Sequence, residues 1–372
     1  MIWSPLLDSY LAPAQYHSAL RMKLSPSILC VAALAFCSCN ALAEKIVLVA
    51  GGAKDEVGLS ALEAKLKEPF ATGFDADGTM WILEMVSGNR LLKVGADGVL
   101  QHVAGTGKVG ASGDGGPGLE AEFNGPHSLV VLPDGDVLIG DTWNGYVRKF
   151  SAKTGKVEAL PGYKAAKGKE KGNGPYCIAL NPEGSKLYIA NLLQVHEVDL
   201  ATGKDRVVAG NGKKGRPEDG AVAVDAPLVD PRAVAVDHQG QIYVLERGGN
   251  ALRVVDKAGK IKTVVNASGA KGGTGDGGPA LDATMNGPKH LCVDNDDTVI
   301  IADAESHLVR RYDPKTGLIT RIAGTGKQGS AGVGGDPTQC QVSRPHGVIV
   351  HPATGELYIT DSYNNRVLKI VK

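Results

Sequence analysis

Short apolar runs recur along the chain at the spacing expected for β-strands. The runs are about four to six residues long, rich in Val, Ile, Leu and Tyr, and bounded by Gly, Asp or Pro, as in "SLVVLPDGD" (Ser128–Asp136) and "VAVDHQGQ" (Val234–Gln241). Such runs between turn-forming residues are typical of strands. No helical period is sustained, apart from one short piece at Leu59–Leu66. The pattern predicts an all-β protein.

The runs are grouped into a unit that recurs six times. Each unit starts at a proline that follows a glycine-rich or polar loop, and successive prolines are 57, 49, 56, 57 and 57 residues apart. These anchor prolines are Pro69, Pro126, Pro175, Pro231, Pro288 and Pro345. Four short strands per unit of this length indicate a β-propeller blade. We therefore expect residues 44–372 to form a six-bladed β-propeller.

The two ends of the repeat array predict how the ring closes. The last unit supplies three strands, which we expect at Gly347–Val350, Glu356–Thr360 and Val367–Val371. The stretch "KIVLVAGG" (Lys45–Gly52) resembles "LITRIAGTG" (Leu318–Gly326), which ends the preceding unit. The N-terminal strand is therefore expected to complete the last blade, which removes the exposed sheet edges.

The N-terminus has the features of a signal peptide over residues 1–43. Arg21 and Lys23 form a basic region, and the apolar run Ile28–Phe36 is too short to span a bilayer. Ala41–Ala43 has the small-residue form of a cleavage site, so the mature chain is expected to begin at Glu44. The expected location is secreted or periplasmic, with no transmembrane helix in the mature chain.

Two details of this segment leave alternatives open. Translation starting at Met22 would give the signal peptide a more usual length. A lipid anchor on Cys37 or Cys39 is the weaker alternative, because Phe36 is bulky for a lipoprotein processing site.

Composition narrows the classes of partner. The 372 residues carry a formal net charge of +0, which argues against nucleic acid. Three cysteines remain after the signal, Cys177, Cys292 and Cys340, and their odd number and unrelated spacing indicate neither a disulfide framework nor a zinc motif. We expect a monomer that takes a small molecule or a protein partner at one face of the propeller.

Several phrases resemble a known repeat family. "DSYNNRVLKI" (Asp361–Ile370), "DTWNGYVRKF" (Asp141–Phe150) and the "AGTG…GDGGP" loop are similar to the NHL-repeat β-propellers, particularly the bacterial and teneurin-type subgroup. The resemblance covers the chain after the signal and implies the propeller fold. It does not imply one function, because the same scaffold hosts binding modules and several enzymes.

The glycine-rich loops have three interpretations. "GTGKVGASGDGG" (Gly105–Gly116) contains a "GTGK" similar to a phosphate loop, but Val109 stands where Ser or Thr is required and no helix follows. "GDGG" is similar to calcium-binding repeats but lacks their nine-residue period. The favoured interpretation is a structural connection between blades, with glycines supplying turns of positive φ.

The strand order predicts two sets of residues near one mouth of the central channel. One set follows the anchor prolines, and the other ends the second strand of each unit. The first set is Phe70, His127, Tyr176, Arg232, Lys289 and His346, and the second is Glu84, Asp141, Asn191, Glu246, Asp303 and Asp361.

The second set has a structural and a functional interpretation. In the structural one, each acid caps a turn and pairs with the arginine that follows, as Asp141 with Arg148, Asp361 with Arg366 and Glu84 with Arg90. In the functional one, some acids face the channel and bind a cation or act as a base. A weak similarity to gluconolactonase-like propellers implies a carboxylate–amide metal site of Glu84, Asn191 and Glu246.

His127 and His346 share one repeat position, and Arg232 occupies it in a third, alternate blade. The Pro-His pairs resemble those of peptidyl-α-hydroxyglycine α-amidating lyase, which implies a zinc site, but an arginine cannot serve as the third ligand. His290 is one residue out of register and is expected to turn away.

Two functions remain open. The first is ligand or partner binding at the channel mouth by His127, Arg232, His346, Tyr176, Lys289, Glu84 and Glu246. The alternative is a metal-assisted lyase or lactonase, with zinc or calcium as the candidate cofactor and His127 and His346 as the candidate ligands.

Overall fold

The computed structural model describes residues 43–53, 60–164 and 174–372. All but the last residue of the expected signal peptide lies outside the described residues. None of the described helices is long and apolar enough to cross a membrane.

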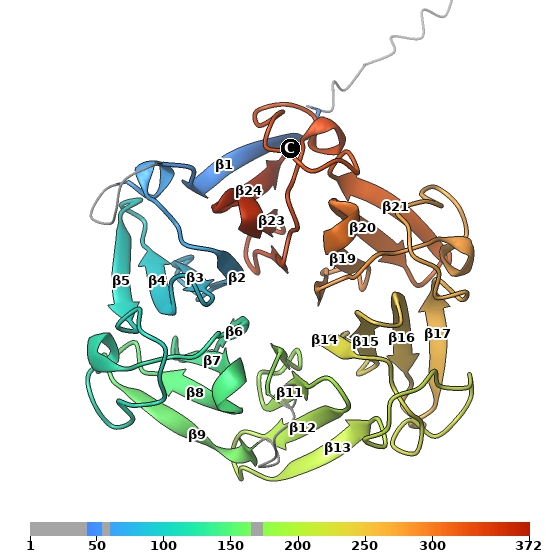
Figure 1. The fold of residues 1–372 in the computed structure, drawn as a ribbon, viewed down its shortest axis with the longest axis horizontal. Coiled ribbons are helices and arrows are strands. Elements are labelled where there is room, and N and C mark those ends of the chain that lie inside the picture. Colours follow the sequence, from blue (N-terminus) through green and yellow to red (C-terminus); the bar gives the residue numbers. More distant parts are fainter. Residues whose placement is uncertain (1–42, 54–59, 165–173) are drawn as a thin grey trace, which may run out of the picture. The chain divides into compact units, whose positions relative to one another are not determined.

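The described chain forms six four-stranded antiparallel sheets arranged around a central axis (Figure 1). Blade 1 consists of β2 (Pro69–Phe74), β3 (Met80–Glu84), β4 (Arg90–Val94) and β5 (Leu100–Ala104). Blade 2 consists of β6 (Ser128–Val131), β7 (Val137–Asp141), β8 (Tyr146–Phe150) and β9 (Val157–Lys164). Blade 3 consists of β10 (Cys177–Leu180), β11 (Lys186–Ala190), β12 (Val195–Asp199) and β13 (Asp205–Ala209). Blade 4 consists of β14 (Pro231–Val236), β15 (Ile242–Glu246), β16 (Ala251–Val255) and β17 (Ile261–Val265). Blade 5 consists of β18 (His290–Val293), β19 (Val299–Asp303), β20 (Leu308–Asp313) and β21 (Leu318–Ala323). Blade 6 consists of β22 (Gly347–Val350), β23 (Leu357–Asp361), β24 (Arg366–Val371) and β1 (Lys45–Gly51). The prediction of an all-β, six-bladed propeller is confirmed.

Closure of the ring also follows the prediction. β1 pairs antiparallel with β24, with Ile46 opposite Ile370, and forms the outer strand of blade 6. Figure 1 shows β1 beside β24, which carries the C-terminus. The ends of the described propeller therefore share one sheet.

Within the described residues, the helical segments between strands are short 3₁₀ turns. They are η1 (Ala61–Glu63), η2 (Gly118–Glu120), η3 (Thr142–Asn144), η4 (Ala280–Asp282), η5 (Ala304–Ser306), η6 (Pro337–Gln339) and η7 (Ser362–Asn364). The helical piece expected at Leu59–Leu66 is thus a single turn over Ala61–Glu63 in its described part. Three of these turns, η3, η5 and η7, directly follow β7, β19 and β23 on the side of the anchor prolines.

The core lies between neighbouring blades, so the middle strands are buried on both faces. The largest cluster joins blades 3 to 5 and includes Val195, Tyr243, Leu252 and Ile301, each at most 1% exposed. Strands packed on both faces need continuous apolar runs instead of alternation. Burial of this kind provides the main stabilisation of the fold, at about 25 cal/mol per Å² of apolar surface.

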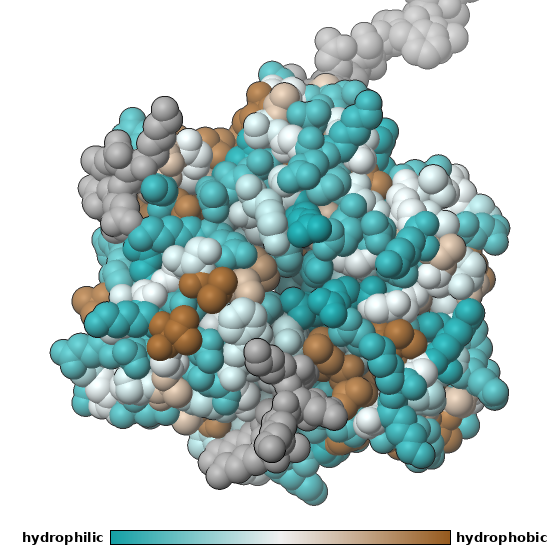
Figure 2. Space-filling view, in the orientation of Figure 1, coloured by the Kyte–Doolittle hydropathy of each residue, from teal (hydrophilic) through white to brown (hydrophobic). Residues whose placement is uncertain are grey.

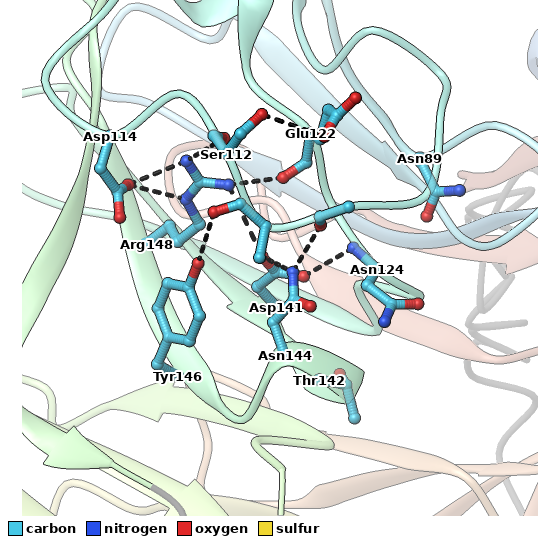
Figure 3. Close-up of polar contacts among 12 residues, drawn as sticks. Asn89, Ser112, Asp114, Glu122, Asn124, Asp141, Thr142, Asn144, Tyr146 and Arg148 are labelled. Atoms are coloured by element: carbon cyan, nitrogen blue, oxygen red, sulfur yellow. Dashed lines mark hydrogen bonds and ion pairs between the residues drawn. The ribbon is translucent and has the colours of Figure 1, made fainter.

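The first glycine-rich loop folds over a buried arginine of β8 (Figure 3). Arg148 donates to the Asp114 carboxylate at 3.0 Å and to the carbonyls of Glu122 and Ser112 at 2.6 and 3.0 Å. Gly113 adopts φ +96°, and a Cβ there would lie 2.5 Å from the Cα of Ala121. Gly113 is therefore required by close backbone approach, and Asp114 of "GDGG" forms an internal ion pair with Arg148.

The same arrangement recurs in blade 5, where Arg310 donates to Asp276 and to the carbonyls of Thr284 and Thr274. In blade 6, Arg366 instead pairs with Asp361 and donates to the carbonyls of Ser330 and Gln341. The contacts support the structural interpretation of the glycine-rich loops.

Candidate functional site at the channel mouth

The residue after each anchor proline is placed by an unusual local backbone. The residue before the proline has a positive φ, between 46° and 57°, in five of the six units, namely Glu68, Gly125, Asp230, Gly287 and Arg344. A residue with a side chain is strained in this conformation. In blades 1 and 4 a register shift also leaves Phe70 and Arg232 without a partner on the next strand. Such a bulge redirects the extra side chain.

Five of these six residues form a continuous chain of contacts around the mouth. The Phe70 ring stacks on His346 at 4.1 Å between centroids and meets His127 edge-on at 5.2 Å. His127 meets Tyr176 at 4.9 Å, and the guanidinium carbon of Arg232 lies 4.1 Å from the centroid of the Tyr176 ring. We call the set Phe70, His127, Tyr176, Arg232, Lys289 and His346 the mouth ring.

Arg232 is a charged residue of the mouth ring that lacks an ion pair among the described residues. It is 7% exposed, and among the described residues it makes no hydrogen bond or ion pair. Its acidic neighbour, Asp230, is paired with the Nε of Arg247 at 2.6 Å. Burial, and then the positive charge of Arg247, lower the pKa of Arg232 to about 10. The guanidinium remains charged at neutral pH and is buried against the Tyr176 ring, with Asp230 near enough to oppose part of the fall in its pKa.

Lys289 closes the mouth ring on the side of blade 5. Its Nζ lies 3.2 Å from Glu305, which also pairs with Arg344 at 2.7 Å. Burial and the charge of Arg232 lower the pKa of Lys289. Arg247 pairs with Asp230, and Lys289 and Arg344 both pair with Glu305, while Arg232 pairs with neither carboxylate. Four cations therefore stand against two carboxylates, and this side of the mouth has an excess of positive charge.

The two histidines are neutral and leave the same nitrogen, Nε2, without a partner among the described residues. Nδ1 of His127 lies 2.6 Å from the carbonyl of Gly125, and Nδ1 of His346 lies 2.8 Å from that of Arg344. A carbonyl only accepts, so Nδ1 carries the proton and Nε2 carries the lone pair. Burial, with the nearby cations, holds the pKa of both rings well below 6.5.

The structure corrects the expectation for Glu84 and Glu246. Both are 0% exposed and pair with an arginine of the following strand: Glu84 with Arg90 at 2.7 Å, Glu246 with Arg253 at 2.8 Å. Each also accepts a backbone N–H from the loop before the proline. The prediction that these two carboxylates line the mouth is wrong, because their oxygens are used inside the blades.

The other members of that set are also structural. Asp141 lies 3.7 Å from Arg148 and accepts from the N–H of Asn124, and Asp361 pairs with Arg366 at 2.7 Å. Asn191 accepts from the N–H groups of its own turn. The capping and ion-pair interpretation is confirmed for the three predicted pairs.

The donor set does not fit a divalent cation. No group of three His, Cys, Asp or Glu side chains with metal-binding geometry occurs in the described part of the chain. The position of a third ligand beside His127 and His346 is held by Arg232, and positive charge acts on both imidazoles. A zinc or calcium ion would be repelled there, whereas an anion would be attracted. His290, as expected, turns away, and its Nδ1 accepts from the N–H of Val348.

Sequence reasoning missed a second set of residues, two positions after the strand-ending acid. Trp143 and Tyr363 are 48% and 47% exposed, and each ring lies 5.8 Å from a mouth-ring histidine, His127 and His346 respectively. In blade 1 the equivalent residue is Val86, 37% exposed. Figure 2 shows hydrophilic residues around the centre of the face it presents and apolar residues further out. The available signal was the shared repeat position of Trp143 and Tyr363.

Comparison with known proteins agrees with the fold. The teneurin NHL domain model matches residues 118–274, and the NHL repeat model matches residues 343–370. The protein SUPPRESSOR OF QUENCHING 1 of Arabidopsis thaliana is 25% identical over 70% of this chain, and human teneurin-1 is 30% identical over 41%. The chain covers 26% and 6%, respectively, of the lengths of these relatives.

Among solved structures, an auxiliary nutrient binding protein from Bacteroides ovatus superposes with a TM-score of 0.65 at 16% identity, covering 88% of this chain and 76% of that one. At this identity the likeness concerns the fold. The two family models and the six closed repeats support an NHL-repeat β-propeller.

Proposed function

We propose that this propeller is an exported binding protein that takes a small anionic molecule at the mouth ring. The observation that carries the proposal is Arg232, a buried guanidinium without an ion pair or hydrogen bond among the described residues. Burying an unpaired charge is costly, and a buried ionisable group without a protein partner marks a candidate ligand site. Lys289 and the excess positive charge around it support the same ligand class.

The experiment compares ligand-induced stabilisation of the wild type with that of the Arg232→Gln variant. Inorganic phosphate is the probe, and the readout is the melting temperature over a phosphate titration at constant ionic strength. Binding to the folded state alone raises stability by RT ln(1 + [L]/Kd). We expect phosphate to stabilise the wild type and to have no effect on Arg232→Gln. Without phosphate, Arg232→Gln should be at least as stable as the wild type, because it removes an uncompensated buried charge.

A matched control is Arg206→Gln in β13, whose guanidinium is on an exposed edge and pairs with Glu197 at 2.9 Å. This variant should keep the full phosphate response. An unchanged response in Arg232→Gln would contradict the proposal, as would no stabilisation of the wild type by phosphate or by any small carboxylate.

Export rests on the N-terminal segment, where a basic region, a short apolar run and Ala41–Ala43 occur in the order of a signal peptide. Expression of the full chain in a Gram-negative host, followed by N-terminal sequencing of the periplasmic fraction, tests this. The expected mature sequence starts Glu44-Lys45-Ile46. A chain that keeps residues 22–43 in the cytoplasm would contradict export, and a lipid on Cys37 or Cys39 would establish the anchored alternative.

A lyase or lactonase activity is the second candidate, and one observation favours it. His127 and His346 are neutral, and their Nε2 lone pairs have no partner among the described residues. A neutral imidazole beside a guanidinium is suited to accept a proton while the cation stabilises the developing oxyanion. In this case His127→Gln and His346→Gln should abolish turnover of a bound lactone or hydroxy acid while keeping its affinity. Turnover at the wild-type rate in both variants would exclude this role.

A further inference from the structure

The mouth is divided into a charged side and an apolar side. Blades 4 and 5 contribute Arg232, Arg247, Lys289 and Glu305. Blades 6, 1 and 2 contribute an unbroken band of rings, linked by centroid distances of 4.1 to 5.8 Å, that runs through Tyr363, His346, Phe70, His127 and Trp143. Tyr176 connects this band to Arg232, because its ring lies 4.9 Å from His127 and 4.1 Å from the guanidinium carbon. A ligand bound at Arg232 would therefore meet the edge of the apolar side as well as cations.

The indole of Trp143 is held in place by its contact with Gly125. Gly125 adopts φ +55°, and a Cβ on it would lie 2.5 Å from Cε3 of the indole. One face of the indole thus packs against the glycine backbone, while the side chain remains largely exposed. In blade 5 the equivalent place beside Gly287 is taken by Glu305, so the fold itself does not require an aromatic residue there. A rigid, exposed indole beside a binding site offers a flat apolar surface at low entropic cost.

The imidazoles add a third chemical requirement. Nε2 of His127 and of His346 only accepts hydrogen bonds, because Nδ1 of each ring already donates to a carbonyl. The complementary groups on a ligand are hydroxyls. A ring with a carboxylate, several hydroxyls and an apolar face satisfies Arg232, the two imidazoles and Trp143 at once.

We infer that the ligand is an acidic sugar, with its carboxylate held by Arg232 and Lys289, hydroxyls donated to His127 and His346, and one ring face on Trp143. This inference rests on the proposed anion-binding function and specifies its substrate class. An aromatic acid would use Arg232 and Trp143 but leave the two imidazole lone pairs unpaired. A neutral sugar would leave Arg232 unpaired. Both cost affinity, since a buried polar group without a partner is unfavourable.

Isothermal titration calorimetry on the full mature chain tests the inference with four probes: digalacturonate, galactose, benzoate and inorganic phosphate. We expect digalacturonate to bind at least about ten-fold more tightly than the other three, the loss expected for missing one charged hydrogen bond. Trp143→Ala should weaken digalacturonate binding about ten-fold and leave phosphate binding unchanged, and Trp143→Phe should restore most of the affinity. Leu119→Ala, at a 54% exposed leucine of η2 in the glycine-rich loop, is the matched control and should bind all probes as the wild type does.

The outcomes separate the two proposals. If none of the anions binds, or if Arg232→Gln binds them as the wild type does, the anion-binding function itself fails and the acidic-sugar inference fails with it. If Arg232→Gln loses all anions but Trp143→Ala binds digalacturonate normally, only the inference is overturned. Benzoate binding as tightly as digalacturonate would also overturn the inference, in favour of an aromatic acid.

Discussion

Ile46 of β1 lies opposite Ile370 of β24, and the side chain of Ile46 is fully buried. This pair joins the two ends of the ring. Ile46→Ala should lower the free energy of unfolding by about 3 kcal/mol, because it leaves a cavity in the core of blade 6. Deletion of residues 44–52 should cost more, since it also exposes the edge of β24.

Chemical denaturation monitored by circular dichroism measures both effects. The control is Leu318→Ala, at the start of the equivalent outer strand in blade 5, where the leucine is 39% exposed. Its expected cost is under about 1 kcal/mol. A deletion variant with the unfolding free energy of the wild type would show that β1 does not close the ring.

Arg148 and Lys149 are consecutive on β8 and should behave oppositely on substitution. Arg148→Gln leaves Asp114 and two loop carbonyls without their donor, with an expected cost of about 3–5 kcal/mol. Lys149→Gln removes a surface pair with Glu158 and should cost under about 1 kcal/mol. Unfolding free energies give the comparison, and limited proteolysis should show new cleavage within residues 105–118 only for Arg148→Gln. Similar losses in both variants would contradict the structural role of the loop contacts.

Gly125→Ala should disturb Trp143, whereas Gly135→Ala should not. Both glycines have positive φ, +55° and +87°, so each alanine has a strain of about 1–2 kcal/mol. A Cβ at Gly125 collides with the indole, while nothing lies within 4 Å at Gly135. Acrylamide quenching of tryptophan fluorescence should therefore increase in Gly125→Ala alone, because the other described tryptophan, Trp81, is 3% exposed. Equal quenching in both variants would show that Gly125 does not position Trp143.

Asp303 should make the free energy of unfolding fall as pH rises from about 4 to about 7. Burial raises the pKa of this carboxyl to about 7. Within the described residues its Oδ2 makes no hydrogen bond, although Arg310 lies 3.6 Å away. The unfolded value of this pKa is about 4. Between these two values the folded chain holds the proton and the unfolded chain does not, so the stability from this group is full below pH 4 and is lost by about pH 7.

Melting temperatures of the wild type and Asp303→Asn from pH 4 to pH 9 isolate this effect. The melting temperature of the wild type minus that of Asp303→Asn should decrease up to about pH 7 and then stay constant. The buried histidines act in both proteins and cancel in the difference. A constant difference for Asp303→Asn would mean that its pKa is not raised.

Repeat spacing located the mouth ring because one residue type, proline, marks the same backbone position in every unit. His127 and His346 can be placed on this basis from the amino-acid sequence alone. The burial of Glu84 cannot, because the position of an acid at a strand end does not show which side of the sheet its carboxylate occupies. The arginine six residues later, Arg90, carried that information and correctly predicted the pair.

The properties that matter most for binding depend on contacts across turns. Arg232 has no ion pair among the described residues, because Asp230 pairs with Arg247 instead. The order of these residues along the chain does not reveal which of the two arginines the carboxylate pairs with. Likewise, the exposure of Trp143 depends on how η3 packs against Gly125. These features require the three-dimensional arrangement.

The sheet shared by the two chain ends sets an order of assembly. β1 is the first described strand to be synthesised, but its partner β24, ending at Val371, is the last. Blades 1 to 5 are each built from consecutive strands and can form as they emerge, whereas blade 6 must wait for the C-terminus. Until then β1 exposes an unpaired edge rich in valine and leucine, so the last step of folding is also the step that protects the chain from association with its neighbours.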